Sequence, residues 1–211
     1  MGLNFFDKIL YINLDIRKDR NENILNELSK LEVDKNKIVR IEAVYEPLNG
    51  HKGCALSHIK ALDYAIKNNF KNVLILEDDA LFQYDKKFID KHIKNFFKKI
   101  DNWDVFFLGG NIQKKENTSY KKIFKVKRSL CSHAYVVNKH YFERLKECFI
   151  ASFSLLDNCL FFNQTLGLPL DCIWQILEER DNWYIQQPII VQQSSSYSDI
   201  MLTQRDRKHI I

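Results

Sequence analysis

The sequence predicts one α/β domain with a mostly parallel central sheet, and three observations support this prediction. Residues 73–76 are a short run of branched apolar side chains, which is typical of a strand buried on both faces. Similar runs alternate with segments of helical periodicity, and this alternation favours parallel strands joined by crossover helices. The chain has 211 residues, 45% of them hydrophobic, so it can bury the core of one large domain.

The first half of the chain supplies most of the predicted elements. Apolar runs predict strands at residues 8–15, 37–44, 72–79 and 104–110. Apolar side chains at helical spacing predict helices at residues 19–31, 53–66 and 85–100. Gly53 is expected to open the second of these helices, where free backbone N–H groups could meet an anion.

The second half is less regular. Alternating apolar and charged residues predict an edge strand, and apolar runs predict further strands. In chain order these elements are an edge strand at 120–127, a strand at 130–137, a helix at 139–149 and short strands at 183–186 and 188–192. Residues 151–168 fit a helix or a lid, and residues 194–200 fit a polar loop. We expect one domain over residues 1–203 and a basic, mobile tail over 204–211.

Three consecutive carboxylates, Glu77, Asp78 and Asp79, follow the apolar run at 73–76. Clustered negative charge at the end of a buried strand is unfavourable unless a cation or a polar ligand lies there. In open α/β sheets, ligands bind beyond the carboxyl ends of the strands. The triplet therefore indicates a divalent-metal site with a phosphorylated ligand, and the alternative is an acidic turn exposed to solvent.

A second candidate site follows the first strand. Asn13 lies at the end of this strand, and Arg17 and Arg20 come soon after it. An amide and two cations beyond a strand end suit a nucleotide base and a diphosphate. An ordinary basic first turn of the helix at 19–31 would give the same pattern.

Two further candidates are the pair Ser57 and His58, and Asp171. Ser57 and His58 lie about one turn into the helix expected at 53–66, where a core or capping histidine is the alternative to a ligand-binding one. Asp171 follows a proline that marks a helix start, so we expect it to cap that helix. A carboxylate at a helix N-terminus is oriented and kept ionised, so capping and catalysis are compatible.

Composition limits the classes of function. The net charge of +5 suits an anionic donor, an anionic acceptor or a membrane surface, and no pattern of basic and aromatic residues indicates a nucleic-acid site. The five Cys lack a CxxC pair, which argues against structural zinc and fits a reduced, cytoplasmic protein. The first residues lack the features of a signal peptide, and no apolar run reaches the ~20 residues of a membrane span.

Taken in order, segments along nearly the whole chain resemble the family 25 glycosyltransferases, which include bacterial lipo-oligosaccharide galactosyltransferases and the collagen hydroxylysine galactosyltransferase domain. The matching segments are Tyr11-Ile-Asn-Leu-Asp15, Ile41-Glu-Ala-Val44, Gly53-Cys-Ala-Leu-Ser-His58, Val73-Leu-Ile-Leu-Glu-Asp-Asp79, Asp104-Val-Phe-Phe-Leu-Gly109, His133-Ala-Tyr-Val-Val137, Pro169-Leu-Asp171, Pro188-Ile-Ile-Val-Gln192 and Ser198-Asp-Ile200. Two features depart from the family pattern. Tyr45-Glu46 stands where Asp-Gly is frequent, and residues 151–168, where we expect acceptor specificity, match no segment.

The resemblance implies a GT-A fold, a single α/β domain that binds a nucleotide sugar through Mn²⁺ or Mg²⁺. The acidic triplet stands for the family's Asp-x-Asp motif, and side chains at i and i+2 share a face, so Glu77 and Asp79 are expected to bind the metal. Asp199 is expected as a third metal ligand, with His133 as the alternative. The residues expected to contact the nucleotide sugar are Asn13, Leu14, Arg17, Arg20, Ser57, His58, Glu77 and Asp78.

The resemblance also implies the reaction. A hexose, either galactose or glucose, would move from a UDP-sugar to a hydroxyl of a glycan, a glycolipid or a hydroxylysine-type acceptor, with inversion at the anomeric carbon. Inversion needs a base on the face opposite the leaving group, and Asp171 is expected to be this base. A homodimer and a peripheral membrane contact stay open. The alternatives from other classes are a metal-dependent phosphohydrolase that acts on nucleotide sugars and a non-catalytic module that binds UDP-sugars or glycans.

Overall fold

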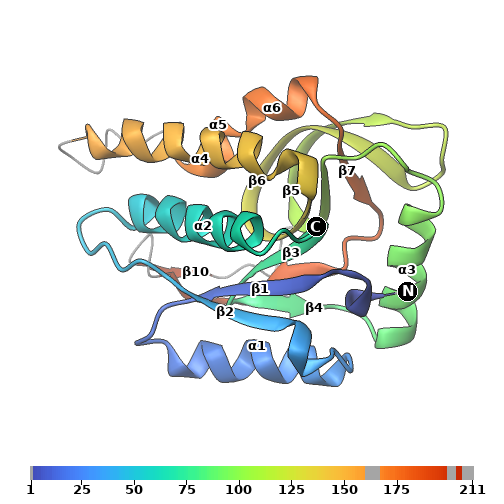
Figure 1. Ribbon diagram of the computed structural model, residues 1–211, viewed down its shortest axis with the longest axis horizontal. Coiled ribbons are helices and arrows are strands. Elements are labelled where there is room, and N and C mark those ends of the chain that lie inside the picture. Colours follow the sequence, from blue (N-terminus) through green and yellow to red (C-terminus); the bar gives the residue numbers. More distant parts are fainter. Residues whose placement is uncertain (1, 160–166, 199–202, 206–211) are drawn as a thin grey trace.

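The computed structural model describes residues 2–159, 167–198 and 203–205, and Figure 1 shows a central sheet with helices on both faces. The strands of this sheet are β1 Lys8–Asn13, β2 Ile38–Glu42, β3 Asn72–Glu77, β5 Val105–Asn117, β6 Ile123–Asn138 and β7 Trp183–Gln186. Their order is β2-β1-β3-β6-β5-β7. β6 runs antiparallel to each strand that it pairs with, and the other pairings are parallel. The predicted α/β domain with a mostly parallel sheet is confirmed.

Helices cover the two faces of the sheet. The α-helices are α1 Lys18–Lys30, α2 Gly50–Lys67, α3 Lys86–Phe97, α4 Phe142–Asp157, α5 Leu170–Ile173 and α6 Gln175–Arg180, and the short 3-10 helices are Leu3–Phe5, Lys35–Lys37 and Lys139–Tyr141. Apolar side chains of α1 and α3 pack into one core cluster, and those of α2, α4 and α5 pack into another. Successive residues of β3 alternate between the two clusters, so this strand is buried on both faces, as the run at 73–76 predicts.

β5 and β6 form one long hairpin, which differs from the prediction. The segments 120–127 and 130–137 were expected as two strands, but residues 123–127 and 130–137 belong to one continuous strand, β6. The prediction of an edge strand at 120–127 is wrong because both sides of β6 are occupied there. Phe124 pairs with Asn117 of β5 and with Ile185 of β7. The pairing of β5 with β6 contains register shifts, and Cys131 of β6 has a left-handed backbone with φ of 70°. The hairpin is therefore irregular, and β6 lies next to β3, the strand that ends in the acidic triplet.

Helix α2 begins three residues before the predicted start. Asn49 caps it, because its side chain accepts a hydrogen bond from the backbone N–H of Lys52. The N–H of Gly53 donates to the carbonyl oxygen of Asn49 at 3.3 Å, so the prediction that Gly53 opens the helix with a free N–H is wrong. Gly53 instead permits close packing, since a Cβ there would lie 2.5 Å from the carbonyl oxygen of Val44.

Two short strands, β4 Ala80–Phe82 and β8 Val191–Gln193, pair antiparallel beside the main sheet. β8 passes close to Gly109 of β5. A Cβ on Gly109 would lie 2.3 Å from the carbonyl oxygen of Val191 and 2.4 Å from Nε2 of His133. Only a residue without a side chain permits this approach.

The C-terminal part adds β9 Ser196–Ser198 and β10 Thr203–Arg205, which pair antiparallel. β9 lies inside the segment 194–200 that was expected to be a polar loop, and β10 includes the first two residues of the expected tail. Residues 151–157 continue α4, whereas residues 160–166 of the expected helix or lid lie outside the described part of the chain. Within the described residues, no helix is long and apolar enough to cross a membrane.

Candidate active site

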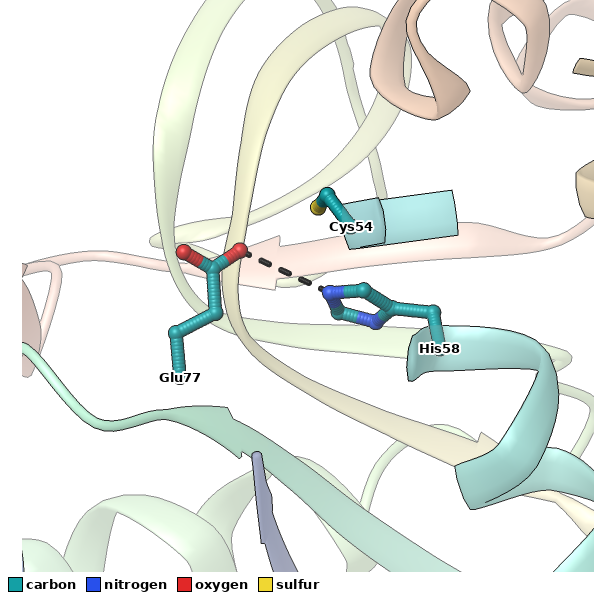
Figure 2. A group of neighbouring side chains, drawn as sticks. All are labelled: Cys54, His58 and Glu77. Carbon is teal, nitrogen blue, oxygen red and sulfur yellow. Dashed lines mark ion pairs between the residues drawn. The ribbon is translucent and has the colours of Figure 1, made fainter. Parts of the chain in front are cut away.

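Glu77, the last residue of β3, meets side chains from two other elements. Ser132 of β6 donates a hydrogen bond from Oγ to Oε1 of Glu77 at 2.6 Å. Nε2 of His58 on α2 lies 3.6 Å from the same oxygen, as the dashed line in Figure 2 shows. Burial favours the neutral acid, but the contacts with His58 and Ser132 outweigh it and lower the pKa of Glu77. Glu77 is therefore an ionised carboxylate at neutral pH.

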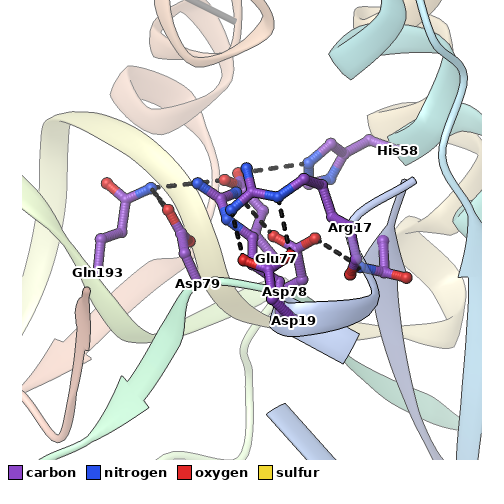
Figure 3. Close-up of polar contacts among 9 residues, drawn as sticks. Arg17, Asp19, His58, Glu77, Asp78, Asp79 and Gln193 are labelled. Carbon is purple, nitrogen blue, oxygen red and sulfur yellow. Dashed lines mark hydrogen bonds and ion pairs between the residues drawn. The ribbon is translucent and has the colours of Figure 1, made fainter. Parts of the chain in front are cut away.

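Asp79 converges with Glu77 on one amide group (Figure 3). Nε2 of Gln193 on β8 lies 3.3 Å from Oδ2 of Asp79 and 3.5 Å from Oε2 of Glu77. The two carboxylates thus lie on the same side of the chain, as their i, i+2 spacing predicts. Carboxylate oxygens are the ligands that Mg²⁺ and Mn²⁺ prefer, so this pair is the part of the triplet best suited to a hard divalent cation.

Asp78 contacts a different set of side chains. Nδ2 of Asn13 donates to Oδ2 of Asp78 at 2.8 Å, and Nη1 of Arg20 donates to Oδ1 at 3.0 Å. Asp78 is 8% exposed, and burial raises its pKa while Arg20 and Asn13 act in the opposite direction. This carboxylate therefore joins the end of β3 to β1 and α1, and the triplet is not an acidic turn exposed to solvent.

The predicted nucleotide-binding residues after β1 make contacts within the chain. Asn13 is 1% exposed, donates to the carbonyl oxygen of Arg17 at 3.1 Å and accepts from Nε of Arg40 at 3.0 Å. The guanidinium group of Arg17 pairs with Asp19 at 2.9 Å. The carbonyl oxygen of Leu14 accepts the N–H of Arg17 at 2.9 Å. These bonds fix the turn between β1 and α1, and contacts of Asn13, Leu14 and Arg17 with a nucleotide stay predictions.

Two cavities flank the acids. One has a volume of about 490 Å³, and its lining includes Arg17, Arg20 and Asp79. The other has a volume of about 530 Å³, and its lining includes His133 and Gln193. Gln193 is within hydrogen-bond distance of Asp79, so each cavity borders one partner of this contact. The acidic cluster therefore lies between a space bordered by both cationic and acidic side chains and a space whose border includes amide and imidazole groups.

Ser57 and His58 are each 1% exposed. Oγ of Ser57 donates to the carbonyl oxygen of Gly53 at 2.6 Å and accepts from the N–H of Val44 at 2.8 Å, so it holds the loop before α2. Nδ1 of His58 lies 2.7 Å from Oη of Tyr135, and Nε2 faces Glu77. These contacts give Ser57 a structural role and place His58 beside the acids, and their contacts with a nucleotide sugar stay predictions.

Asp171 lies in the first turn of α5 but does not cap it. The capping residue is Pro169, and Oδ2 of Asp171 accepts a hydrogen bond from the backbone N–H of Cys131 at 2.8 Å. The capping prediction is wrong because strand β6 supplies a donor that the sequence around Asp171 does not reveal. Burial raises the pKa of Asp171, while the N–H of Cys131 acts in the opposite direction. Cys131 also lines the 530 Å³ cavity, so Asp171 contacts one of the residues that line that space.

Of the two candidates for a third metal ligand, Asp199 and His133, only His133 lies within the described part of the chain. Asp199 lies outside the described residues. His133 places Nε2 3.4 Å from the carbonyl oxygen of Val191 and borders the 530 Å³ cavity. A role for either residue at a metal stays a prediction.

Three neighbours of the acids were not among the predicted site residues. Ser132 and Gln193 contact Glu77 but are separated from it by 55 and 116 positions in the sequence, and no local sequence pattern reveals such contacts. Cys54, which lies close to Glu77 and His58, did carry a signal. It precedes His58 by four positions, so a helix places both on one face.

Comparison with known proteins agrees with the resemblance in the sequence. The model of glycosyltransferase family 25 (LPS biosynthesis protein) matches residues 33–156, more than half of the chain. Procollagen galactosyltransferase 2 of Homo sapiens is 28% identical over 132 residues, which cover 49% of this chain and 21% of that protein. The Mus musculus protein of the same name is 26% identical with the same coverage. The match therefore spans about a fifth of the length of these relatives.

One solved structure supports the fold. Mannose-1-phosphate geranyltransferase from Thermus thermophilus matches with a TM-score of 0.50 at 10% sequence identity, covering 85% of this chain and 73% of that chain. At this identity the likeness concerns the fold alone. Together with the sheet order and the family match, it confirms the predicted GT-A-type α/β fold.

Proposed function

Because the chain belongs to glycosyltransferase family 25 and is therefore a glycosyltransferase, we propose that it transfers a hexose from a UDP-sugar to an acceptor hydroxyl with inversion. The observation that supports this proposal most directly is the convergence of Glu77 and Asp79 on Gln193, between the two cavities. A donor on one side and an acceptor on the other would meet at these acids.

The donor diphosphate is proposed to occupy the 490 Å³ cavity. Arg17 and Arg20 line this space, and guanidinium groups suit phosphate oxygens. Each of them also pairs with an aspartate, Asp19 or Asp78, so its position is set before a ligand arrives. Preorganised cations stabilise the negative charge that develops on a leaving diphosphate.

The proposed metal ligands are Glu77 and Asp79, with Asp199 as a third. The first two fit a hard cation, because their oxygens approach one amide group and Glu77 is ionised at neutral pH. Mn²⁺ or Mg²⁺ bound there would supply a Lewis acid for the leaving diphosphate. Within the chain, Ser132 orients Glu77 by donating to Oε1, and Gln193 orients the pair by donating to both carboxylates.

Asp171 is the proposed general base. Its carboxylate is held by the N–H of Cys131, a residue that lines the 530 Å³ cavity, and this cavity would hold the acceptor. Burial raises its pKa, and a carboxylate of raised pKa removes a proton from a hydroxyl more readily than an ordinary aspartate does. The proton of the acceptor hydroxyl would pass to an oxygen of Asp171 as the sugar–oxygen bond forms.

Galactose is the proposed sugar, with glucose as the second choice, because the curated relatives are galactosyltransferases by name. The proposed acceptor is a hydroxyl of a glycan, a glycolipid or a hydroxylysine-type residue. A cytoplasmic location with peripheral membrane contact, a homodimer, and a domain that ends at residue 203 are proposals that depend on sequence alone.

The proposal is tested by UDP release from UDP-galactose and UDP-glucose with Mn²⁺, measured with a panel of glycan acceptors. Asp171→Asn should lower kcat by about 10²–10⁴-fold and leave UDP binding near the wild-type value, because the base acts only on the acceptor. Asp79→Ala should lower turnover and weaken UDP binding as well. Full turnover in Asp171→Asn would remove Asp171 as the base. Release of inorganic phosphate without an acceptor would indicate a phosphohydrolase instead.

A further inference from the structure

A cysteine, a histidine and a glutamate meet beside the proposed oxygen site (Figure 2). Cys54 and His58 are one turn apart on α2, and Glu77 ends β3. Each offers one donor atom, and the three atoms all lie within 4.8 Å of one another. We infer that Cys54, His58 and Glu77 form a second metal site, which binds a thiophilic divalent cation such as Zn²⁺.

The spacing of the three side chains fits such a cation. In a tetrahedral zinc site with bonds of about 2.0–2.3 Å, neighbouring ligand atoms are about 3.3–3.6 Å apart. Nε2 of His58 and Oε1 of Glu77 are 3.6 Å apart, which is too long for a hydrogen bond and suits two ligands of one ion. Three protein ligands would leave the fourth position for a water molecule.

His58 gives a second, independent indication of a ligand. Its side chain is 1% exposed, and Nε2 is buried without a hydrogen-bond partner. A buried polar atom without a partner is unfavourable, and a bound cation would remove this penalty. The other ring nitrogen, Nδ1, lies 2.7 Å from Oη of Tyr135. When Nδ1 donates to that oxygen, the lone pair of Nε2 faces the cluster, as in metal sites where an outer partner fixes the ring.

The surroundings of Cys54 also favour a dication. The carboxylates of Glu77, Asp171 and Asp79 place negative charge near the Cys54 side chain. The same charges attract a cation, and a thiol that coordinates a metal loses its proton. Binding therefore releases the Sγ proton of Cys54 to solvent and forms one metal–sulfur bond.

This site differs in chemistry from the proposed Mn²⁺ or Mg²⁺ site. Sulfur and imidazole donors select zinc-like ions, whereas the oxygens of Glu77 and Asp79 select hard ions. The inference of Zn²⁺ binding does not depend on glycosyl transfer. One consequence does rest on the proposed function: because both sites use Glu77, Zn²⁺ should weaken Mn²⁺ binding and slow transfer.

Co²⁺ is the probe for this site, because a cobalt–thiolate bond has a charge-transfer band in the near ultraviolet. Titration of the full chain should give the band at one equivalent of Co²⁺, and Zn²⁺ should abolish it. Cys54→Ser should remove the band and weaken Zn²⁺ binding by at least about 100-fold. Cys148→Ser, which changes a half-buried cysteine of α4 outside the cluster, should keep both.

A wild-type chain without the band, or a band that survives in Cys54→Ser, would overturn the inference. A second measurement needs no variant. X-ray absorption of the Zn²⁺-loaded wild-type chain should show one sulfur among nitrogen and oxygen ligands, and a shell without sulfur would also overturn the inference. Mn²⁺ binding and UDP release in zinc-free buffer test the proposed function separately, so failure there leaves the cobalt result standing.

Discussion

Two largely buried glutamates in this fold bond to serines on the same strand, and yet their pKa values shift in opposite directions. Glu77 accepts from Oγ of Ser132, and Glu178 of α6 accepts from both the N–H and Oγ of Ser129. The pKa of Glu77 is lowered, because the contacts with His58 and Ser132 outweigh burial. The pKa of Glu178 is raised to about 7 by burial, which its bonds to Ser129 only partly offset.

The difference lies in the neighbours other than the serines. Glu77 faces the ring of His58, whereas the charges that act on Glu178 are those of Asp171 and Glu179, which are negative and raise its pKa further. Burial of a carboxylate therefore does not identify a functional site by itself. A buried carboxylate that stays ionised can attract a cation, whereas a protonated one is a poor ligand for a hard cation.

The largest expected effect is a difference in transferase activity between variants of the two glutamates. Glu77→Gln should lower kcat/KM for UDP-galactose by at least about 100-fold, because a neutral amide is a poor ligand for a hard cation. Glu178→Gln, the matched control, should stay within about two-fold of wild type, because the hydrogen bonds of Glu178 go to Ser129 rather than to the proposed ligand groups. UDP release measures both variants. Equal losses in the two variants would contradict the distinction between them.

The next effect concerns stability and pH. The folded pKa of Glu178 is about 7, against an ordinary value of 4.5, so the folded state holds a proton that the unfolded chain has lost between these two values. Stability contributed by this proton is present below pH 4.5 and is lost as the pH rises through 7, by up to about 3 kcal/mol. Glu178→Gln stays neutral, so it should be more stable than wild type at pH 8 by about 2–3 kcal/mol and similar at pH 4.

Urea unfolding at the two pH values measures this difference. Asp→Asn changes at exposed positions such as Asp101 give a control for the loss of one carboxylate without burial. If Glu178→Gln were no more stable than wild type at pH 8, the pKa of Glu178 would not be raised by folding, and the contrast with Glu77 would fail.

The smallest effects come from the two serines. Ser132→Ala removes the donor that orients Glu77, and it should lower transfer by about 10-fold with little change in the urea midpoint. Ser129→Ala removes the Oγ donor to Glu178, and it should lower the free energy of unfolding by about 1 kcal/mol with transfer unchanged. Transfer rate and urea unfolding are measured for both variants. If Ser132→Ala lost stability and Ser129→Ala lost transfer, the roles assigned to the two serines would be wrong.

The sequence predicted the fold best where the signal is local. The apolar run at 73–76 and the helical periodicity around it depend only on neighbouring residues, and β3 and its flanking helices lie within a few residues of the prediction. β6 was predicted less well. Its two halves were expected as separate strands, and the pairing of its polar part on both sides depends on β5 and β7, which lie elsewhere in the sequence. The left-handed conformation of Cys131 had no sequence signal, since glycine is the usual residue for it.

The candidate site divides in the same way. The spacing of two residues predicts that Glu77 and Asp79 point the same way, and in the structure both carboxylates approach Gln193. Asp171 was singled out as a helix cap, but its partner is the N–H of Cys131, 40 positions away. Cys54 could have been found by its spacing from His58, whereas Ser132 and Gln193 become neighbours of the acids only through the fold.

Gly109 shows how a residue remote from the chemistry can be as restricted as the carboxylates themselves. A methyl group there would lie 2.3 Å from the carbonyl oxygen of Val191, so β8 would have to retreat from the sheet. β8 carries Gln193, and its retreat would take the amide away from Asp79. A survey of tolerated substitutions should therefore find Gly109 nearly invariant for steric reasons alone. Attempts to change acceptor preference through residues 191–193 should start from a chain that keeps this glycine.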